Sequence, residues 1–507
     1  MTDFLEKIKQ HSEKDPDGVF YEYMIPGGEC KKLTWKELWD KAESLASYMD
    51  ENLKTTTPVV VYGHKDPMMI VCFLGSLLSG RGYCPVDTSV PSDRVRGIID
   101  NLKPEMILSP CDEEGPEGCV TLSEIEGIIA GSSNMISADK AIKGSDVCYI
   151  IYTSGSTGTP KGVQITGECL DNFIHWAMGL GDGVSEGEKP VFLNQAPFSF
   201  DLSVMDLYMC LYSGGTLHVL PKKVQADIGL LMESLGSSNA GIWVSTPSFA
   251  EVCLSDKRFS QELLPEMKRF LFCGETLPPV VVKRLRERFP KAEVINTYGP
   301  TESTVAITDV TVTDKVCEEY DPLPVGRIKP GSELKIRDEK GEDLPEGESG
   351  EIIILGDTVS IGYRNLPEQS AKAFFEENGV RGYRTGDKGY LKDGMLFYQG
   401  RIDLQIKLHG YRIELEDIEN NLMKLTGVEK ATVIPNEKDG KIVSLTACII
   451  PEKMPESAFK AGQELRAEAK SFLPDYMIPK KFLFFEELPM TGNGKTDRRA
   501  LLASLKK

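Results

Sequence analysis

A ten-residue loop, TSGSTGTPKG at 153–162, carries residue types that suit phosphate binding. Its three glycines let the backbone turn N–H groups inward, while five hydroxyls and one lysine add side-chain donors. A Walker A loop is excluded because Pro160 replaces the second glycine of that pattern and Gly162 replaces its hydroxyl. The alternative is a flexible surface turn, although Lys161 directly after the proline argues against a mere linker.

A second candidate, NTYGPTE at 296–302, leaves the end of a predicted strand, where open α/β sheets bind ligands. Tyr298 can stack on a base, Thr301 can bond a phosphate, and Glu302 can offer an oxygen to Mg²⁺. The alternative is a Gly-Pro turn that leads into a helix.

Two further segments place charged groups beside glycine. Asp387, in YRTGD at 383–387, can bond ribose hydroxyls, although the residues alone favour an ordinary turn. In GRID at 400–403, Arg401 can reach phosphate and Asp403 can act as a hinge, or the segment is a solvated linker.

The last candidate, TGNGK at 491–495, presents Lys495 at a glycine-rich loop tip. A lysine in such a loop is ordinarily solvent-exposed. The functional interpretation is a mobile domain that delivers one cation to an active site.

Short apolar strands alternate with helical patterns around these segments, which predicts an α/β fold with largely parallel sheets. We expect a large N-terminal domain at 1–402 that consists of layered α/β sheets and includes a β-rich subdomain at about 309–402. A small mobile α+β domain would follow at 403–507. The predicted strands are 59–62, 105–108, 147–152, 243–245, 270–273, 294–297, 333–337, 351–355, 395–399, 405–408, 432–434, 443–450 and 482–485; the predicted helices are 68–78, 202–211, 280–288 and one from 414.

The composition limits the classes of function. Of 507 residues, 58 are Lys or Arg and 77 are Asp or Glu, so the formal net charge is −19, which opposes nucleic-acid and anionic-membrane binding. No secretory signal or membrane-spanning apolar stretch is visible. The 12 cysteines lack metal-ligand or disulfide spacing, and we expect most to be reduced and buried. We therefore expect a cytoplasmic protein, and a monomer.

Together, in this order and spacing, the five segments resemble the adenylate-forming superfamily of acyl- and aminoacyl-activating ligases. Between them, NQAPFSFDLSVMD at 194–206, TPSF at 246–249, FCGE at 272–275 and QIKLHGYR at 405–412 are similar to the superfamily's D-alanine-activating enzymes of teichoic acid D-alanylation. The resemblance spans essentially the whole chain. It implies ATP-dependent formation of D-alanyl-AMP, with release of pyrophosphate, and transfer to a carrier protein for lipoteichoic acid.

The resemblance also implies roles for individual residues. Lys495, Glu302 and Arg401 would be catalytic, with Glu302 on Mg²⁺ and Asp403 as the hinge. ATP would contact Thr153, Ser154, Gly155, Ser156, Thr157, Gly158, Lys161, Asn296, Thr297, Tyr298, Gly299, Thr301, Asp387, Arg401 and Lys495, and the amino acid would contact Asp201, Leu271, Cys273, Thr297, Val305 and Lys495.

Asp201 would pair with the α-ammonium of the substrate, and the alternative is an N-cap for the following helix. Cys273 would shape a pocket for one methyl group, and the alternative is an ordinary buried strand cysteine. No carrier motif is visible, so the phosphopantetheine thiol would come from a separate protein. Other classes stay open: a stand-alone adenylation enzyme of nonribosomal-peptide type, an acyl-CoA synthetase and a nucleotide-sensing protein without catalysis.

Overall fold

The structure, a computed structural model, describes every residue except 133–135, 155–159, 403–404, 439–440, 490–497 and 506–507. The chain divides into two compact units. The first contains residues 1–88, 101–151 and 162–402, and the second contains 89–100, 152–161 and 403–507. The α/β fold class predicted from the sequence is confirmed.

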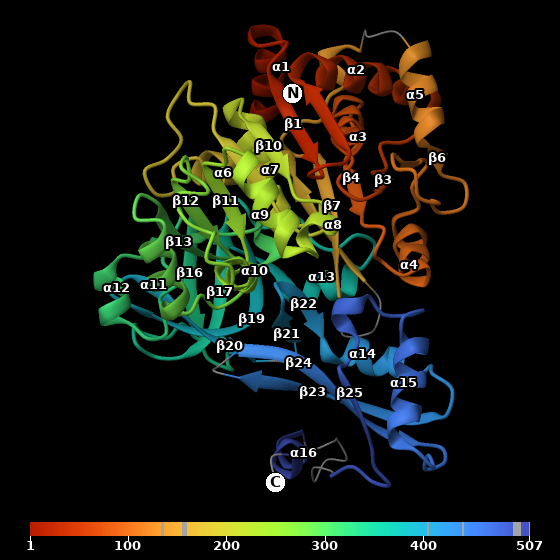
Figure 1. Cartoon of the computed structure of the whole chain (residues 1–507), viewed down its shortest axis with the longest axis vertical. Helices are drawn as coiled ribbons and strands as arrows, with labels where there is room; N and C mark the ends of the chain where they lie inside the picture. Colours follow the sequence, from red (N-terminus) through yellow and green to blue (C-terminus); the bar gives the residue numbers. More distant parts are fainter. Residues whose placement is uncertain (133–135, 155–159, 403–404, 439–440, 490–497, 506–507) are drawn as a thin grey trace. The chain divides into compact units, whose positions relative to one another are not determined.

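A nine-stranded sheet forms one layer of the first unit (Figure 1). Its central strands, from β13 to β1, run parallel, and antiparallel strands complete both edges. The strands, in sheet order, are β15 (Arg327–Ile328), β14 (Thr308–Thr311), β13 (Glu293–Tyr298), β12 (Arg269–Phe272), β11 (Ile242–Ser245), β9 (Val191–Asn194), β10 (Thr216–Val219), β1 (Val19–Met24) and β2 (Cys30–Thr34).

A second sheet has six strands, of which β6, β5, β3, β4 and β7 pair in parallel. The apolar run 59–62 forms β3 as predicted, and three of its four side chains are buried. The strands, in sheet order, are β6 (Val120–Thr121), β5 (Ile107–Ser109), β3 (Val59–Tyr62), β4 (Tyr83–Val86), β7 (Val147–Thr153) and β8 (Lys161–Thr166).

Helices connect these parallel strands, and their apolar side chains join two hydrophobic cores. The predicted helix at 68–78 is observed as α3; Asp66 accepts the N–H of Met68, and Pro67 occupies the first turn, as expected for a helix start. No described helix has the length and apolarity needed to cross a membrane. The helices are α1 (Asp3–Lys14), α2 (Trp35–Asn52), α3 (Pro67–Leu78), α5 (Leu122–Gly131), α6 (Gly167–Ala177), α7 (Leu202–Ser213), α8 (Lys222–Gln225), α9 (Ile228–Ser237), α10 (Pro247–Leu254), α11 (Pro279–Arg288), α12 (Asp314–Glu319) and α13 (Pro367–Ala373).

The third sheet of the first unit is antiparallel. Three of its strands were predicted, whereas β18 and the long β19 were missed. The start predicted for the β-rich subdomain, at about residue 309, falls inside the nine-stranded sheet, because β14 and β15 extend that sheet. The strands are β16 (Ser332–Arg337), β17 (Gly350–Gly356), β18 (Phe374–Glu377), β19 (Val380–Lys392) and β20 (Met395–Arg401).

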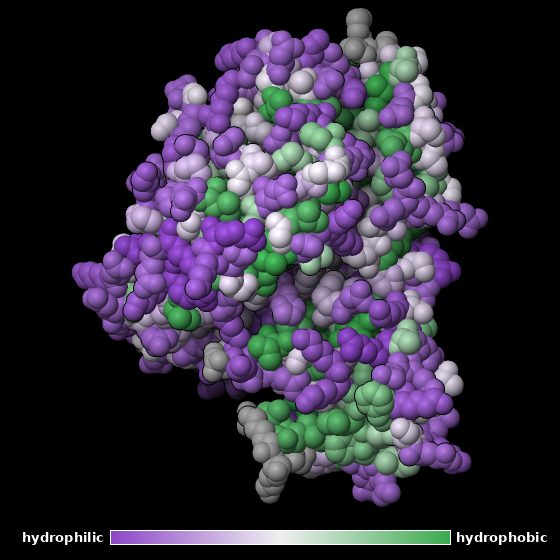
Figure 2. Space-filling view, in the orientation of Figure 1, coloured by the Kyte–Doolittle hydropathy of each residue, from purple (hydrophilic) through white to green (hydrophobic). Residues whose placement is uncertain are grey.

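The second unit has its own α+β core around Ile413, Ile418 and Val433. The face drawn in Figure 2 is mostly hydrophilic, in keeping with the large excess of acidic residues. Its elements are α4 (Ser92–Leu102, which begins in this unit), β21 (Gln405–Leu408), β22 (Tyr411–Glu414), α14 (Leu415–Leu422), β23 (Val428–Lys438), β24 (Lys441–Pro451), α15 (Ala458–Ala469), β25 (Lys481–Phe484) and α16 (Arg498–Leu505).

All 12 cysteines are free thiols, and eight of them are buried. The prediction that most cysteines are buried is therefore confirmed. Cys273 is among the buried ones, at the carboxyl end of β12.

Candidate functional site

The carboxyl ends of β12 and β13 bring together the residues predicted to line a side-chain pocket. The strands are parallel neighbours in which Leu271 pairs with Ile295. The Thr297 hydroxyl donates to the carbonyl of Phe272 at 2.9 Å, and the Cys273 thiol donates to the carbonyl of Val305 at 3.7 Å. Leu271, Cys273, Thr297 and Val305 are each at most 3% exposed.

Two consecutive β-branched residues next to this pocket have left-handed backbone conformations. Thr304 has φ of 60° and Val305 has φ of 67°. This conformation costs of order 1–3 kcal/mol per residue, and such strain concentrates at functional sites. The preceding turn is also tight: a Cβ on Gly299 would lie 2.6 Å from Cα of Ala306, so glycine is required there.

Asp201 directly precedes α7, but its side chain does not cap the helix. The N-cap alternative is therefore wrong for the carboxylate. Instead, Oδ2 of Asp201 accepts the hydroxyl of Thr301 at 2.6 Å, and Asp201 is 8% exposed. The structure thus joins the predicted ammonium-binding carboxylate to the segment at 296–302.

Glu302, the predicted metal ligand, is fully buried. Its Oε1 accepts the hydroxyl of Tyr363 at 2.8 Å, and its carbonyl accepts the N–H of Ser360 at 2.8 Å. Within the described part of the chain, no three His, Cys, Asp or Glu side chains are grouped to hold a metal ion. Among the described residues, Glu302 is a fixed carboxylate that belongs to no such group.

Asp387 is held by two residues that the sequence also singled out. The Tyr298 hydroxyl donates to Oδ2 at 2.5 Å, and Nη1 of Arg401 donates to Oδ1 at 2.9 Å. Burial, together with the charge of Asp387, raises the pKa of Tyr298 well above its usual value, so the phenol stays protonated and donates. All three side chains therefore form one hydrogen-bonded group.

The turn predicted at 383–387 is wrong, because these residues lie inside β19. The strand contains a bulge: Thr385, Gly386 and Asp387 together face the single residue Ile352 of β17. The Thr385 hydroxyl donates to the carbonyl of Ile352 at 2.7 Å and accepts the N–H of Asp387 at 2.9 Å. Bulges reorient one side chain without ending the strand, and here the reoriented side chain is Asp387.

Asn296 is buried within β13, two residues before the strand ends. Its Nδ2 donates to the carbonyl of Pro324 at 2.8 Å, while its Oδ1 has no hydrogen-bond partner among the described residues. A buried acceptor without a partner is costly, which makes this oxygen a candidate contact for a ligand N–H group.

Of the remaining predicted residues, some lie in the second unit and the others lie outside the described part of the chain. In the second unit, Thr153 ends β7, Lys161 begins β8, and the Ser154 hydroxyl donates to the carbonyl of Arg412 at 2.8 Å. Gly155, Ser156, Thr157, Gly158, Asp403 and Lys495 lie outside the described residues.

Sequence reasoning missed Tyr363 and the hydroxyl role of Tyr298. A buried tyrosine between Gly362 and Arg364 carries no motif, so only its contact with Glu302 shows its relevance. For Tyr298, the sequence suggests only that its ring can stack on a base.

Known proteins share both the sequence and the fold. A sequence profile described as AMP-binding enzyme matches residues 8–364, and one described as AMP-binding enzyme C-terminal domain matches residues 417–495. The D-alanine--D-alanyl carrier protein ligase of Listeria monocytogenes serotype 4a (strain HCC23) is 47% identical, with all of both chains covered. The Bacillus licheniformis protein of the same name is also 47% identical, with 98% of each chain covered.

Among solved structures, holo-PA1221, an NRPS protein containing adenylation and PCP domains, superimposes with a TM-score of 0.81 at 26% identity. The alignment covers 99% of this chain and 84% of that protein. The motifs, the fold and these matches agree, and the chain belongs to the AMP-binding enzyme family of adenylate-forming ligases, which use ATP.

Proposed function

We propose that this chain activates D-alanine as D-alanyl-AMP, with release of pyrophosphate, and transfers the D-alanyl group to the phosphopantetheine thiol of a separate carrier protein for lipoteichoic acid D-alanylation. The full-length relatives that carry the corresponding name support this assignment. The structural observation that carries it is the buried carboxylate of Asp201, which accepts a hydrogen bond from Thr301, the residue next to Glu302.

In the first half-reaction, an oxygen of the D-alanine carboxylate attacks the α-phosphorus of ATP, and pyrophosphate leaves. Both reactants are anionic, so catalysis consists mainly of positioning and charge neutralisation. In this proposal Thr153, Thr157 and Lys161 hold the β- and γ-phosphates. In the same proposal, Lys495 would neutralise charge between the substrate carboxylate and the α-phosphate.

The nucleoside would be held by the group around Asp387. This carboxylate bonds the ribose hydroxyls while Tyr298 and Arg401 fix its orientation. The ring of Tyr298 stacks on adenine, and the unpartnered Oδ1 of Asn296 suits the exocyclic amine of adenine. The ribose would thus be bound by Asp387, and the adenine by Tyr298 and Asn296 of β13.

Glu302 fits the role of a magnesium ligand, because Mg²⁺ in nucleotide sites takes one or two carboxylates and completes its coordination with phosphates and water. When bound, Mg²⁺ would neutralise charge on the phosphates. Tyr363 holds one oxygen of Glu302 and so orients the carboxylate.

The amino acid would enter with its ammonium on Asp201 and its methyl group against Cys273, Leu271, Thr297 and Val305. A fatty or aryl acid has no ammonium to pair with the Asp201 carboxylate, and loss of one partner of a buried ion pair costs about 3–5 kcal/mol. A pocket discriminates one methyl group by only about 1–3 kcal/mol, so weak activation of glycine is expected.

For the second half-reaction, we propose that the domain at 403–507 rotates about Asp403 relative to the domain at 1–402. This rotation removes Lys495 and brings the 408–412 segment to the site, where the thiolate attacks the adenylate carbonyl carbon and AMP leaves. The enzyme would be a cytoplasmic monomer.

ATP–pyrophosphate exchange across D-alanine, L-alanine, glycine and larger amino acids tests the proposal. We expect D-alanine to give the highest kcat/KM. Preference for another amino acid would indicate an adenylation enzyme of peptide-natural-product type. Exchange that requires a fatty acid would indicate an acyl-CoA synthetase, and no exchange with any acid would indicate a nucleotide-binding protein without catalysis.

A further inference from the structure

Lys65 is a lysine buried in the first unit, at the carboxyl end of β3, and it is only 1% exposed. Its backbone is left-handed, with φ of 48°, a conformation that is unfavourable for a residue with a side chain. The hydroxyl of Tyr21 donates to its carbonyl at 3.0 Å and so holds the strained peptide in place. Such a conformation persists only where the surroundings enforce it.

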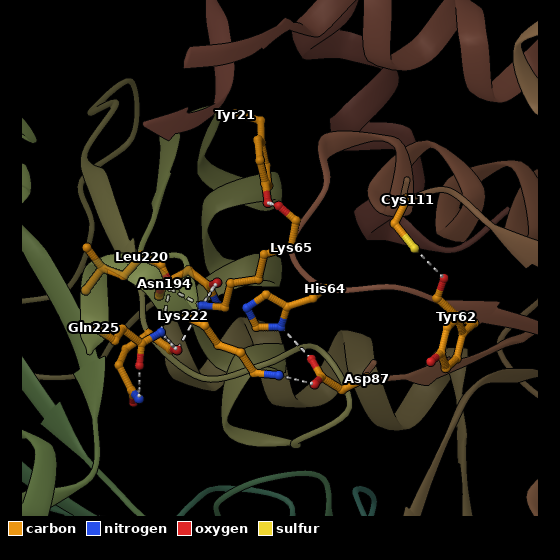
Figure 3. A network of polar contacts seen from close by, with 11 residues as sticks. Tyr21, Tyr62, His64, Lys65, Asp87, Cys111, Asn194, Leu220, Lys222 and Gln225 are labelled. Carbon is orange, nitrogen blue, oxygen red and sulfur yellow. Dashed lines mark hydrogen bonds and ion pairs between the residues drawn. The ribbon is translucent and has the colours of Figure 1, made fainter. Parts of the chain in front are cut away.

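The Lys65 ammonium donates hydrogen bonds to three oxygen atoms, and Figure 3 shows its contact with Asn194. Nζ donates to the carbonyl of Asn194 at 3.0 Å, to Oδ1 of Asn194 at 2.8 Å and to the carbonyl of Gln195 at 2.8 Å. A protonated lysine has three N–H donors, and each of these acceptors can take one of them. Lys65 thus fixes the chain where β9 ends.

Asn194 is also hydrogen-bonded to α7. Its Nδ2 donates to Oδ1 of Asp206 at 2.9 Å, and Asp206 is fully buried. The carbonyl of Gln195 also accepts Nε2 of Gln225 at 3.0 Å. A hydrogen bond therefore joins Asn194 and Asp206, the two ends of the segment at 194–206, and Asp201 lies between them in the chain.

We propose that Lys65 is a positioning residue for substrate selection: its three hydrogen bonds hold the 194–206 segment in the shape that presents Asp201 to the substrate ammonium. This inference rests on the proposed function, in which Asp201 binds that ammonium. It adds a determinant that lies outside every motif identified from the sequence, because Lys65 acts through Asn194 and Gln195 and does not itself contact substrate.

The neighbouring contacts of Asp87 supply a matched control. His64 Nδ1 lies 2.5 Å from Oδ2 of Asp87, and Lys222 Nζ lies 3.2 Å from Oδ1 of Asp87 (Figure 3). Lys222 is a second lysine in the same region, but its side chain is 55% exposed, and its bond to Asp87 does not involve the 194–206 segment. Loss of its charge should leave Asp201 in place.

Pyrophosphate exchange with Lys65→Met and Lys222→Met, in the full chain, tests the inference. We expect Lys65→Met to raise the KM for D-alanine about 10-fold and to leave the KM for ATP within about 2-fold, with Lys222→Met equal to wild type. Equal changes in both KM values, or none, would overturn the inference. Failure of the wild type to activate D-alanine would instead overturn the proposed function, and the inference with it.

Combination with Asp201→Asn separates positioning from general stability. If Lys65 acts through Asp201, the double variant should activate D-alanine no more weakly than Asp201→Asn alone, whereas a purely structural effect would add to it. If Lys65→Met does not fold, Lys65→Gln is the second variant, because its amide keeps N–H donors for some of the three acceptors. Its KM for D-alanine should rise about 3-fold. An unchanged KM in that variant would equally contradict the role.

Discussion

The hydroxyl of Tyr298 donates a 2.5 Å hydrogen bond to the carboxylate of Asp387, although the two residues are 89 positions apart in the chain. The bond connects the end of β13 to the bulge of β19. Tyr298 therefore has two separable functions in the proposed site, which are stacking through its ring and orientation of Asp387 through its hydroxyl.

Tyr298→Phe should weaken ATP binding because it keeps the ring but removes a donor to a buried carboxylate. A hydrogen bond to a charged group contributes about 1.5–3 kcal/mol, so the KM for ATP should rise at least about 10-fold. Pyrophosphate exchange at varied ATP measures this, with Tyr390→Phe in β19 as the control. An equal rise in the KM for D-alanine would contradict the assignment.

Asp201→Asn should abolish most amino-acid activation, because the neutral amide cannot neutralise the substrate ammonium. A loss of about 3 kcal/mol corresponds to a fall of about 150-fold in kcat/KM for D-alanine. Thr301→Val removes only the hydroxyl that donates to this carboxylate, and it should cost less. The ordering is checked by exchange kinetics, and the reverse order would contradict the role of Asp201.

Cys273→Ala should retain exchange activity, since the buried thiol is proposed to shape the pocket and not to act as a nucleophile. The enlarged pocket should improve kcat/KM for D-2-aminobutyrate relative to D-alanine by about 10-fold, within the range for one methylene group. Complete loss of both adenylation and transfer in a folded variant would point to a chemical role for the thiol.

Lys495→Ala should lose adenylation while it keeps most transfer from preformed D-alanyl-AMP. Removal of a group that stabilises transition-state charge costs about 10²–10³ in rate, and the proposed rotation withdraws Lys495 before the second step. Single-turnover assays of each half-reaction measure the two rates. Equal loss of both steps would contradict the rotation.

Glu22 gives a prediction for pH dependence. A hydrogen bond with His218, assisted by Lys32, outweighs the effect of burial and lowers the pKa of Glu22 from 4.5 to about 2. Because the folded-state pKa is the lower one, the stabilisation is present above pH 4.5 and is lost as the pH falls toward 2.

Glu22→Gln should therefore flatten the fall in unfolding free energy between pH 5.5 and 3.5. Allowing for solvent screening of this half-buried group, the difference from wild type should be about 1 kcal/mol. Urea unfolding at the two pH values measures it, and Glu29→Gln on the exposed turn after β1 is the control. Identical slopes for all three proteins would contradict the prediction.

The sequence by itself determined the layered α/β class, many of the strands and the identity of the chemically active segments. These features depend on local patterns: the buried run of β3 is apolar throughout, and the 296–302 motif follows its strand without interruption. Local hydrophobicity and turn chemistry suffice for such assignments.

Only the tertiary structure decided which side chains form hydrogen bonds with one another. The Thr301–Asp201 bond spans 100 positions, and Tyr363 meets Glu302 across 61. The sequence cannot reveal such pairings, because each depends on how separate strands and loops pack. The same holds for the bulge at Asp387 and the left-handed backbone of Lys65, where long-range contacts override the local preference of the chain.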